Sequence, residues 1–253
     1  MACKTAAAAT SVLLALTAAP ACAAAPELRI DVIAQSGIAQ PILYDRAPTP
    51  TANLILFIGG DGDLAHQDNS FLVRVRHAFV AAGLSVAVPD TPSDHPGGFG
   101  PYFRTWTANT NDIAAVIAFL KKQSPAPVWA VGVSNGTISA ASVAAHLGPH
   151  QIAGLALTSA VWLGGLGLVP VAKIAVPVLE VQNRNDACPA AKFDLAKADL
   201  ARFSDAPEKR FIAVSSPPGG EPCGSKSPHD FWGVEDQVVA AIIAWIEAPR
   251  PVR

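Results

Sequence analysis

Short apolar runs alternate with helical stretches from residue 53 to the end of the chain. The segment 53–58 (NLILFI) is a continuous apolar run that ends in Gly59 and Gly60. Because a continuously apolar strand has both faces buried, such a run is typical of the middle of a parallel sheet. The alternation therefore predicts an α/β fold, a doubly wound and mostly parallel central sheet with helices on both faces.

The same pattern places the individual elements along the chain. Strands are expected at 28–34, 41–44, 53–58, 84–88, 128–133, 152–159, 176–182 and 210–214, and the first two look like an antiparallel pair. Helices are expected at 70–82, 112–122, 135–147, 190–203 and 234–247. Because the connections are short, we expect one domain over residues 26–250. The longest structureless stretch is 90–108, and long loops in compact domains are usually functional.

Composition narrows the class of protein. The 253 residues are 51% hydrophobic and 15% charged, which is enough apolar material to bury a core and excludes disorder. Eighteen basic and 20 acidic residues give a net charge of −2 without a basic stripe, which argues against nucleic acid as a partner. The cysteines show no C-x-x-C spacing, and no metal or cofactor is expected.

The N-terminal residues have the organisation of a secretory signal peptide. Lys4 is followed by an apolar Ala/Leu/Val stretch and then by small residues at 21–25. We expect a signal peptide at 1–23, with cleavage at 23–25, and a periplasmic or secreted product without a membrane span. Two alternatives stay open: the uncharged segment could be an N-terminal membrane anchor, although Pro20 interrupts it, or a lipoprotein could be cleaved before Cys22.

Removal of this segment leaves two cysteines, Cys188 and Cys223. An even pair in an exported protein suggests one disulfide, and two buried free thiols are the alternative. A bridge closing a loop of about 35 residues stabilises a protein by up to ~4 kcal/mol in the chain-entropy model.

The motif that carries chemistry is G-x-S-x-G at 132–136. Ser134 lies where the apolar strand PVWAV turns into the helical segment GTISAASVAAHL. On such a turn the serine hydroxyl is held at the C-terminal edge of the sheet, and flanking glycines let neighbouring chain pass closely. The adjacent helix N-terminus favours a developing negative charge. The motif therefore predicts a nucleophilic serine.

A serine nucleophile needs an adjacent base, and the base needs an orienting carboxylate. On this architecture the expected chain order is serine, acid and histidine, each after a strand. Asp186 follows the strand expected at 176–182, and His229 precedes the last helix. Among nearby carboxylates, Asp194 and Asp199 fall within a helix and Asp230 is too close to His229. The other histidines are His66, which could line the site, and His77, His95, His146 and His150.

With these residues the chain resembles the α/β-hydrolase superfamily, in its small exported esterase-like or dienelactone-hydrolase-like group. The resemblance covers roughly 28–247 and is carried by the motifs GVSNG, NRND and SPHDFWG. It implies that Ser134 is the nucleophile, Asp186 the acid and His229 the base. It also implies that a bridge between the two cysteines would link the acid loop to the base loop.

An oxyanion hole is the next requirement of this chemistry. One donor is expected to be the backbone N–H of Asn135, the residue after the nucleophile. The second is expected from the loop after the 53–58 strand, and either Gly60 or Asp61 fits. Where the family often has His-Gly, this chain has Gly-Gly-Asp-Gly.

The walls of the substrate pocket are less constrained by the sequence. Residues 161–175 are too few and too glycine-rich for a large cap domain, so the loop 91–107 is expected to cover the site. The candidate pocket residues are aromatic: Phe99, Tyr102, Phe103, Trp106, Trp162 and Phe231.

The sequence therefore predicts an exported serine hydrolase that acts on carboxylic esters through an acyl-enzyme. Its expected partner is a small-molecule or acyl ester. A peptidase, thioesterase or acyl transferase on the same triad, or a non-catalytic binding protein with this fold, are the alternatives.

Overall fold

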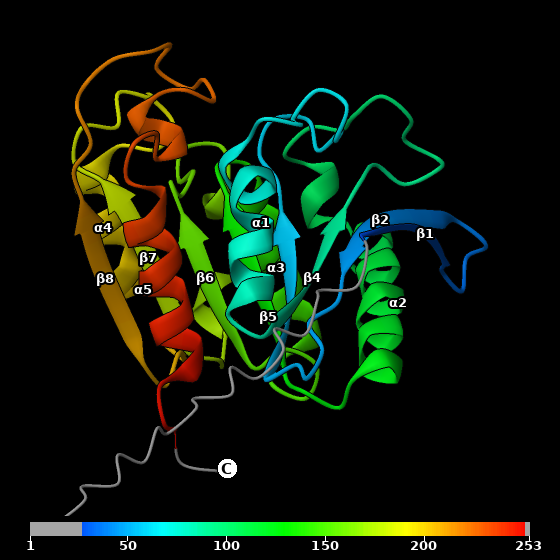
Figure 1. The fold of residues 1–253 in the computed structure, drawn as a ribbon. Helices are drawn as coiled ribbons and strands as arrows, with labels where there is room; N and C mark the ends of the chain where they lie inside the picture. Colours follow the sequence, from blue (N-terminus) through cyan, green and yellow to red (C-terminus); the bar gives the residue numbers. More distant parts are fainter. Residues whose placement is uncertain (1–26, 251–253) are drawn as a thin grey trace, which may run out of the picture.

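One mixed sheet organises the chain, whose residues 27–250 are described by the computed structural model (Figure 1). The expected signal peptide and Cys22 lie outside the described residues. The sheet has eight strands in the order β1-β2-β4-β3-β5-β6-β7-β8. The strands are β1 (Leu28–Ile33), β2 (Ala39–Asp45), β3 (Ala52–Phe57), β4 (Leu84–Pro89), β5 (Val128–Val133), β6 (Gly154–Thr158), β7 (Val178–Asn183) and β8 (Lys209–Val214).

The pairing of the strands confirms the predicted α/β class. Strands β1 and β2 pair antiparallel, and β2 pairs antiparallel with β4, whereas every pairing from β4 to β8 is parallel. Every residue of β3, β4, β5, β6 and β7 is buried, and for β3 the continuous apolar run at 53–58 predicted this. Because parallel strands all end at one edge, the loops that follow β3, β5, β7 and β8 meet there.

Helices cover both faces of the sheet, and each face has its own hydrophobic core. The helices are α1 (Phe71–Ala81), α2 (Thr107–Gln123), α3 (Gly136–Leu147), α4 (Phe193–Asp199) and α5 (Glu235–Glu247). Residues of α1 and α5 pack into one core, on the face turned toward the viewer in Figure 1. Residues of α2, α3 and α4 pack into the core of the opposite face.

Two helices begin at other residues than predicted, and side-chain hydrogen bonds near their first turns accompany the differences. Helix α2 begins at Thr107 rather than 112, and its Asn109 side chain donates a hydrogen bond to the Arg104 carbonyl at 3.3 Å. Helix α4 begins only at Phe193, because the preceding Ala191 is held in a turn whose carbonyl accepts the Gln182 side chain.

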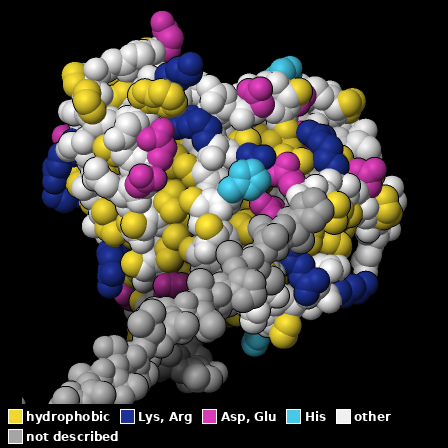
Figure 2. Space-filling view, in the orientation of Figure 1, with side chains coloured by type: hydrophobic (Ala, Val, Ile, Leu, Met, Phe, Trp, Pro, Cys, Tyr) yellow, Lys and Arg dark blue, Asp and Glu magenta, His cyan; other side chains and the backbone are white. Residues whose placement is uncertain are grey.

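The surface charge and the helix lengths bear on the environment of the protein. On the visible part of the face in Figure 2, acidic and basic side chains are interspersed rather than gathered into one patch. Over residues 27–250, no helix is both long enough and apolar enough to cross a bilayer.

Candidate active site

Ser134 lies on a strained turn between β5 and α3. Its φ is 52°, a left-handed conformation that side chains other than glycine rarely adopt. The turn is fixed from both sides, since Ser134 N–H donates to the Thr158 carbonyl at 3.0 Å and the Ser134 carbonyl accepts the Thr137 N–H at 2.9 Å. Strain of this kind persists only where the surroundings enforce it, and it is common at functional sites.

The two glycines of the motif are required by close backbone contacts. A Cβ on Gly132 would lie 2.5 Å from the Gly136 carbonyl oxygen, and a Cβ on Gly136 would lie 2.0 Å from that of Phe57. Neither neighbour is a flexible side chain, so both positions exclude any larger residue. The motif is therefore a packing requirement of this turn, which lets α3 start directly against β3.

The structure brings the imidazole of His229 to the hydroxyl of Ser134. Nε2 of His229 lies 2.9 Å from Oγ of Ser134, although the two residues are 95 positions apart. The His229 side chain is only 3% exposed. A hydroxyl that donates to a shielded imidazole nitrogen has a base in place for its proton.

Asp186 completes a chain of three side chains. Its Oδ2 lies 2.9 Å from Nδ1 of His229, and its side chain is fully buried. The carboxylate also accepts the Cys188 N–H at 2.9 Å and the Gln182 side-chain amide at 3.3 Å. These bonds hold the carboxylate in place and favour the tautomer with a proton on Nδ1, which leaves Nε2 free to accept from Ser134.

The backbone around His229 is anchored by residues that sequence reasoning did not single out as supports. The His229 carbonyl accepts the hydroxyl of Ser159, a residue that itself has a φ of 47°. The His229 N–H donates to the Ser227 hydroxyl at 3.2 Å. A left-handed φ at Ser159, which has a side chain, is a strain signal visible only in the folded structure.

Asp230, next to the histidine, is part of a separate ion-pair network. Its carboxylate accepts the Phe71 N–H at 3.0 Å and pairs with Arg74, which also contacts Glu235 at 3.0 Å. Burial raises the pKa of Asp230 to about 6, against the lowering effect of Phe71 and Arg74. The network ties the His229 loop to the start of α1, and leaves Asp186 as the carboxylate on Nδ1.

A disulfide joins the loop of Asp186 to the loop that leads to His229. Cys188 and Cys223 are bonded, with their Cα atoms 4.8 Å apart. Both cysteines also line the hollow that contains Ser134. The bridge therefore forms part of the wall of the site and restrains the acid and histidine loops relative to one another.

That hollow has a volume of about 280 Å³ and lies at the edge where the parallel strands end. Besides Ser134 and His229, the lining includes the loop after β3, the start of α3 and the disulfide. The lining residues are Gly59, Gly60, Gln67, Ser70, Val133, Ser134, Asn135, Val161, Cys188, Ala190, Cys223, Ser225, His229 and Asp230.

Of the expected oxyanion donors, Asn135 and Gly60 line this hollow and Asp61 does not. Asp61 is the next residue along the loop, and its carboxylate lies 2.7 Å from Nδ1 of His66. That contact also places the histidine, which had been a candidate for the site, at the exposed side of the loop.

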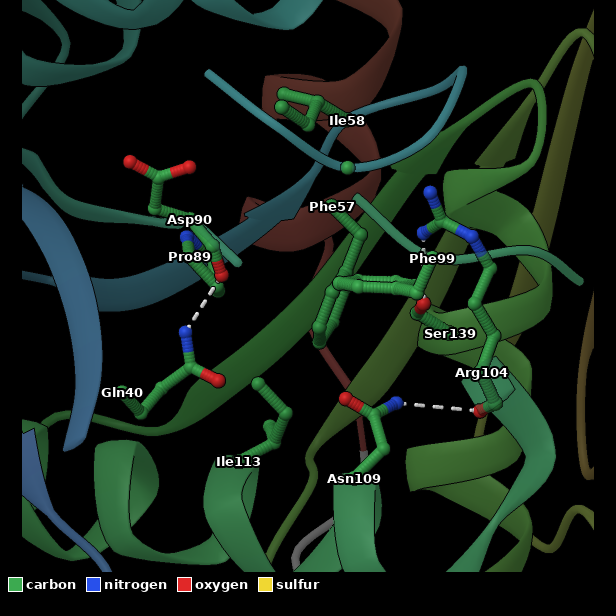
Figure 3. A pocket seen from close by; sticks show the side chains of 11 residues that line it. Gln40, Phe57, Ile58, Pro89, Asp90, Phe99, Arg104, Asn109, Ile113 and Ser139 are labelled. Atoms are coloured by element: carbon green, nitrogen blue, oxygen red, sulfur yellow. Dashed lines mark hydrogen bonds between the residues drawn. The ribbon is translucent and has the colours of Figure 1, made fainter. Parts of the chain in front are cut away.

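The expected aromatic pocket is wrong, because none of the six predicted residues is among those that line the hollow. Trp162 is buried against Phe203, and Phe231 is buried against Phe71. The other four belong to the loop between β4 and α2: Tyr102 and Trp106 are exposed, Phe103 is buried, and Phe99 lines a separate cavity (Figure 3).

The loop 91–107 therefore does not cover the hollow, contrary to prediction. Segments 67–70, 188–190 and 223–225 enclose it instead. The aromatic residues of the long loop pack on one another, with ring centroids 5.0 Å apart for Phe99 and Phe103 and 5.6 Å for Phe103 and Trp106. Within the loop, Phe103 is thereby buried, whereas Tyr102 and Trp106 remain exposed.

Two of the remaining histidines, His77 and His146, have local partners. His77 contacts the buried Asp45 at 2.7 Å, and this pair with Glu27 is the one group of three potential metal ligands within the described part of the chain. Glu27 is already paired with Arg76. His146 contacts the carbonyl of Ser142 in its own helix at 2.7 Å.

The architecture around this site is the α/β-hydrolase fold, as solved structures show. An esterase from Pyrococcus furiosus has a TM-score of 0.67 at 12% identity, over 88% of this chain and 90% of that chain. Dienelactone hydrolase from Anabaena variabilis has a TM-score of 0.64 at 14% identity, over 87% and 96%. Est1E from Butyrivibrio proteoclasticus, solved with ferulic acid bound, has a TM-score of 0.61 at 15% identity, over 87% and 97%.

These likenesses confirm the fold that the motifs predicted. No protein-family profile matches the sequence, and no curated protein matches it. At this level of identity the shared property is the fold itself, and the activity has to be argued from the site.

Proposed function

We propose that the protein is a serine hydrolase of carboxylic esters that uses Ser134, His229 and Asp186 as its catalytic triad. The observation that carries the proposal is the unbroken chain of contacts, 2.9 Å from Oγ to Nε2 and 2.9 Å from Nδ1 to Oδ2. The esterases among the similar solved structures support ester chemistry.

In the first half of the reaction, Oγ of Ser134 attacks the ester carbonyl carbon while Nε2 of His229 takes the hydroxyl proton. The carbonyl π electrons move to the oxygen and form a tetrahedral oxyanion. When that intermediate collapses, the bond to the leaving alkoxy group breaks, and His229 returns the proton to it as the alcohol departs. Asp186 holds the imidazole and stabilises its cationic form.

In the second half, water replaces the alcohol. His229 takes a proton from the water as its oxygen attacks the acyl-enzyme carbonyl and forms a second tetrahedral oxyanion. When that intermediate collapses, the bond to Ser134 breaks, His229 returns the proton to Oγ of Ser134, and the acid product leaves. Backbone N–H donors stabilise the oxyanion in both halves, and removing one such donor typically costs ~3–4 kcal/mol. Asn135 supplies one donor in this proposal.

The lining favours a small acyl group. Around Ser134, the wall residues Ala190, Val161 and Ser70 have short side chains, and the disulfide closes one side. A hollow of about 280 Å³ is just below the usual size of ligand sites, which typically measure roughly 300–1,000 Å³. We therefore propose esters of short or compact acids as the substrates.

Export of the protein is also a proposal. The disulfide supports it, because such bonds persist in oxidising compartments and are rare in the cytosol. N-terminal sequencing of the protein recovered outside the cytoplasm tests it: a start at residues 24–26 is expected, whereas a chain retained with its initial Met contradicts it.

The activity is tested with a fluorophosphonate probe and a series of p-nitrophenyl esters. The wild type should be labelled, and Ser134→Ala should not. Ser142→Ala is the matched control, since Ser142 is a buried serine of α3 outside the hollow and its variant should label normally. Acetate and butyrate esters should be cleaved faster than octanoate esters.

A folded wild type that neither labels nor cleaves any ester would refute the proposal and favour a binding protein. Cleavage of thioesters or peptides in preference to esters would reassign the substrate while retaining the triad.

A further inference from the structure

Arg104 is a buried arginine whose partners are neutral oxygen atoms. It lies on the 3₁₀ turn Phe103–Thr105 of the long loop, and only 2% of its surface is exposed. Nη1 donates to the Ser139 hydroxyl at 2.9 Å, and Cζ lies 4.8 Å from the ring centre of Phe99 (Figure 3). Burying a guanidinium without an ion-pair partner is costly, so its position calls for a physical reason.

The other guanidinium nitrogen contacts the loop beside the nucleophile. Nη2 donates to the Gly59 carbonyl at 3.3 Å and to the Gly60 carbonyl at 3.1 Å. The Gly60 carbonyl also accepts the Asn135 side-chain amide at 3.0 Å. Two consecutive carbonyl groups of this loop therefore point toward Arg104.

This arrangement fixes the direction of the N–H group of Gly60. The Gly59 carbonyl and the Gly60 N–H belong to one peptide unit, and in a trans peptide the two groups point in opposite directions. No cis peptide occurs in the described part of the chain. Because the carbonyl faces Arg104, the N–H faces away from it.

Both residues of that peptide lie beside the nucleophile. Gly59 lies so close to Ser134 that a Cβ on Gly59 would be 3.0 Å from the serine Cβ. Gly60 lines the hollow that contains Ser134, whereas Asp61 does not. The Gly60 N–H is thus the group of this loop placed to reach an oxyanion formed on Ser134.

We propose that Arg104 is a positioning residue for the oxyanion hole: it holds the Gly59–Gly60 peptide so that the Gly60 N–H is the second oxyanion donor. This inference rests on the serine hydrolase function proposed above. It also assigns a role to the long loop, which supports the site from behind rather than covering it.

The positive charge adds an electrostatic contribution. Hydrogen bonds from a charged donor are stronger than neutral ones and hold the carbonyl groups more firmly. A buried cation behind the donor peptide also favours the negative charge that develops in the transition state, because the low-dielectric interior screens it weakly. Burial lowers the pKa of Arg104 to about 9, so the group still carries its charge at neutral pH.

The test compares Arg104→Met and Arg104→Lys with the wild type, using the p-nitrophenyl acetate assay. Because the contribution is made in the transition state, Arg104→Met should lower kcat roughly tenfold to a hundredfold, with KM within about threefold of the wild type. Arg104→Lys keeps the positive charge but loses the planar guanidinium with its several donors. Its kcat should therefore lie between those of Arg104→Met and the wild type.

A transition-state analogue separates positioning from a general loss of structure. A trifluoromethyl ketone forms a tetrahedral oxyanion on the serine, so its affinity should fall in parallel with kcat/KM. The affinity for the carboxylic acid product should not change. Trp245→Phe is the stability control, since this buried residue lies in the last turn of α5, at the end of the strands opposite the site. This variant should keep the wild-type kcat/KM and the wild-type affinity for the trifluoromethyl ketone.

The outcomes are decisive in each case. Unchanged kcat and analogue affinity in folded Arg104→Met overturn the inference, as does a rise in KM alone. If Arg104→Met does not fold, the kcat of Arg104→Lys tests the inference, and a wild-type kcat in that variant overturns the inference. An inactive and unlabelled wild type would instead refute the proposed function, so the two failures are distinguishable.

Discussion

Glu180 provides a quantitative test of how the sheet accommodates a buried acid. This residue of β7 is fully buried, its Oε1 accepts the indole N–H of Trp162 at 3.2 Å, and its Oε2 has no hydrogen-bond partner. Burial raises the pKa of Glu180 from 4.5 to about 8, against the lowering effect of the Trp162 hydrogen bond. The carboxyl group is therefore protonated in the folded protein at neutral pH.

The raised pKa makes the free energy of unfolding depend on pH. Because the folded-state pKa is above the unfolded value, the stabilisation is complete below pH 4.5 and is lost as the pH rises through 8. A shift of that size corresponds to about 5 kcal/mol in total, and the part lost between about pH 5 and pH 7 is about 2.5 kcal/mol.

Glu180→Gln removes this titration and keeps an oxygen for the Trp162 N–H. Urea unfolding of both proteins should show that the variant gains stability over the wild type as the pH increases, by about 2.5 kcal/mol from pH 5 to pH 7. Glu247→Gln, at an exposed position of α5, should show no such trend. A difference between Glu180→Gln and wild type that is constant with pH would refute the reasoning.

Three further predictions concern the site. Asp186→Asn should lower kcat by about 10³–10⁴ in the ester assay, because the amide favours the wrong imidazole tautomer, and a fall of less than tenfold would contradict its role. Replacing Cys188 and Cys223 by Ser should lower the free energy of urea unfolding by roughly 2–4 kcal/mol, and an unchanged midpoint and slope would contradict this. Gly136→Ala should abolish soluble folded protein, whereas Gly100→Ala, which meets open space, should keep the wild-type Tm, and equal Tm values would argue against the close contact.

Much of the architecture was accessible from local sequence patterns. The continuous apolar run of β3 reflects burial on both faces, and burial on both faces is what a central parallel strand imposes on its residues. Glycines at 132 and 136 likewise reflect contacts made within one strand-turn-helix unit and against the adjacent strand. Such features can be predicted from the sequence because the residue type at each position depends on the local environment of that position.

The pocket walls could not be predicted in the same way. Phe99 and Trp106 are aromatic, as residues of pocket walls often are, yet they pack within their own loop or face solvent. Gln67 and Ser225 line the hollow instead. An aromatic side chain favours burial, but its type does not show which residues it packs against. That choice depends on how loops far apart in the sequence pack over the sheet edge.

The sequence by itself determined the succession of strands and helices along the chain and the position of the serine turn. It could do so because periodicity and glycine spacing are local properties of the chain. Only the tertiary structure decided that His229 lies against Ser134, that Arg104 holds the Gly59–Gly60 peptide, and that the disulfide forms a pocket wall. These contacts join residues 35 to 95 positions apart. Their geometry is set by the packing of the whole sheet, for which no short segment carries a signal.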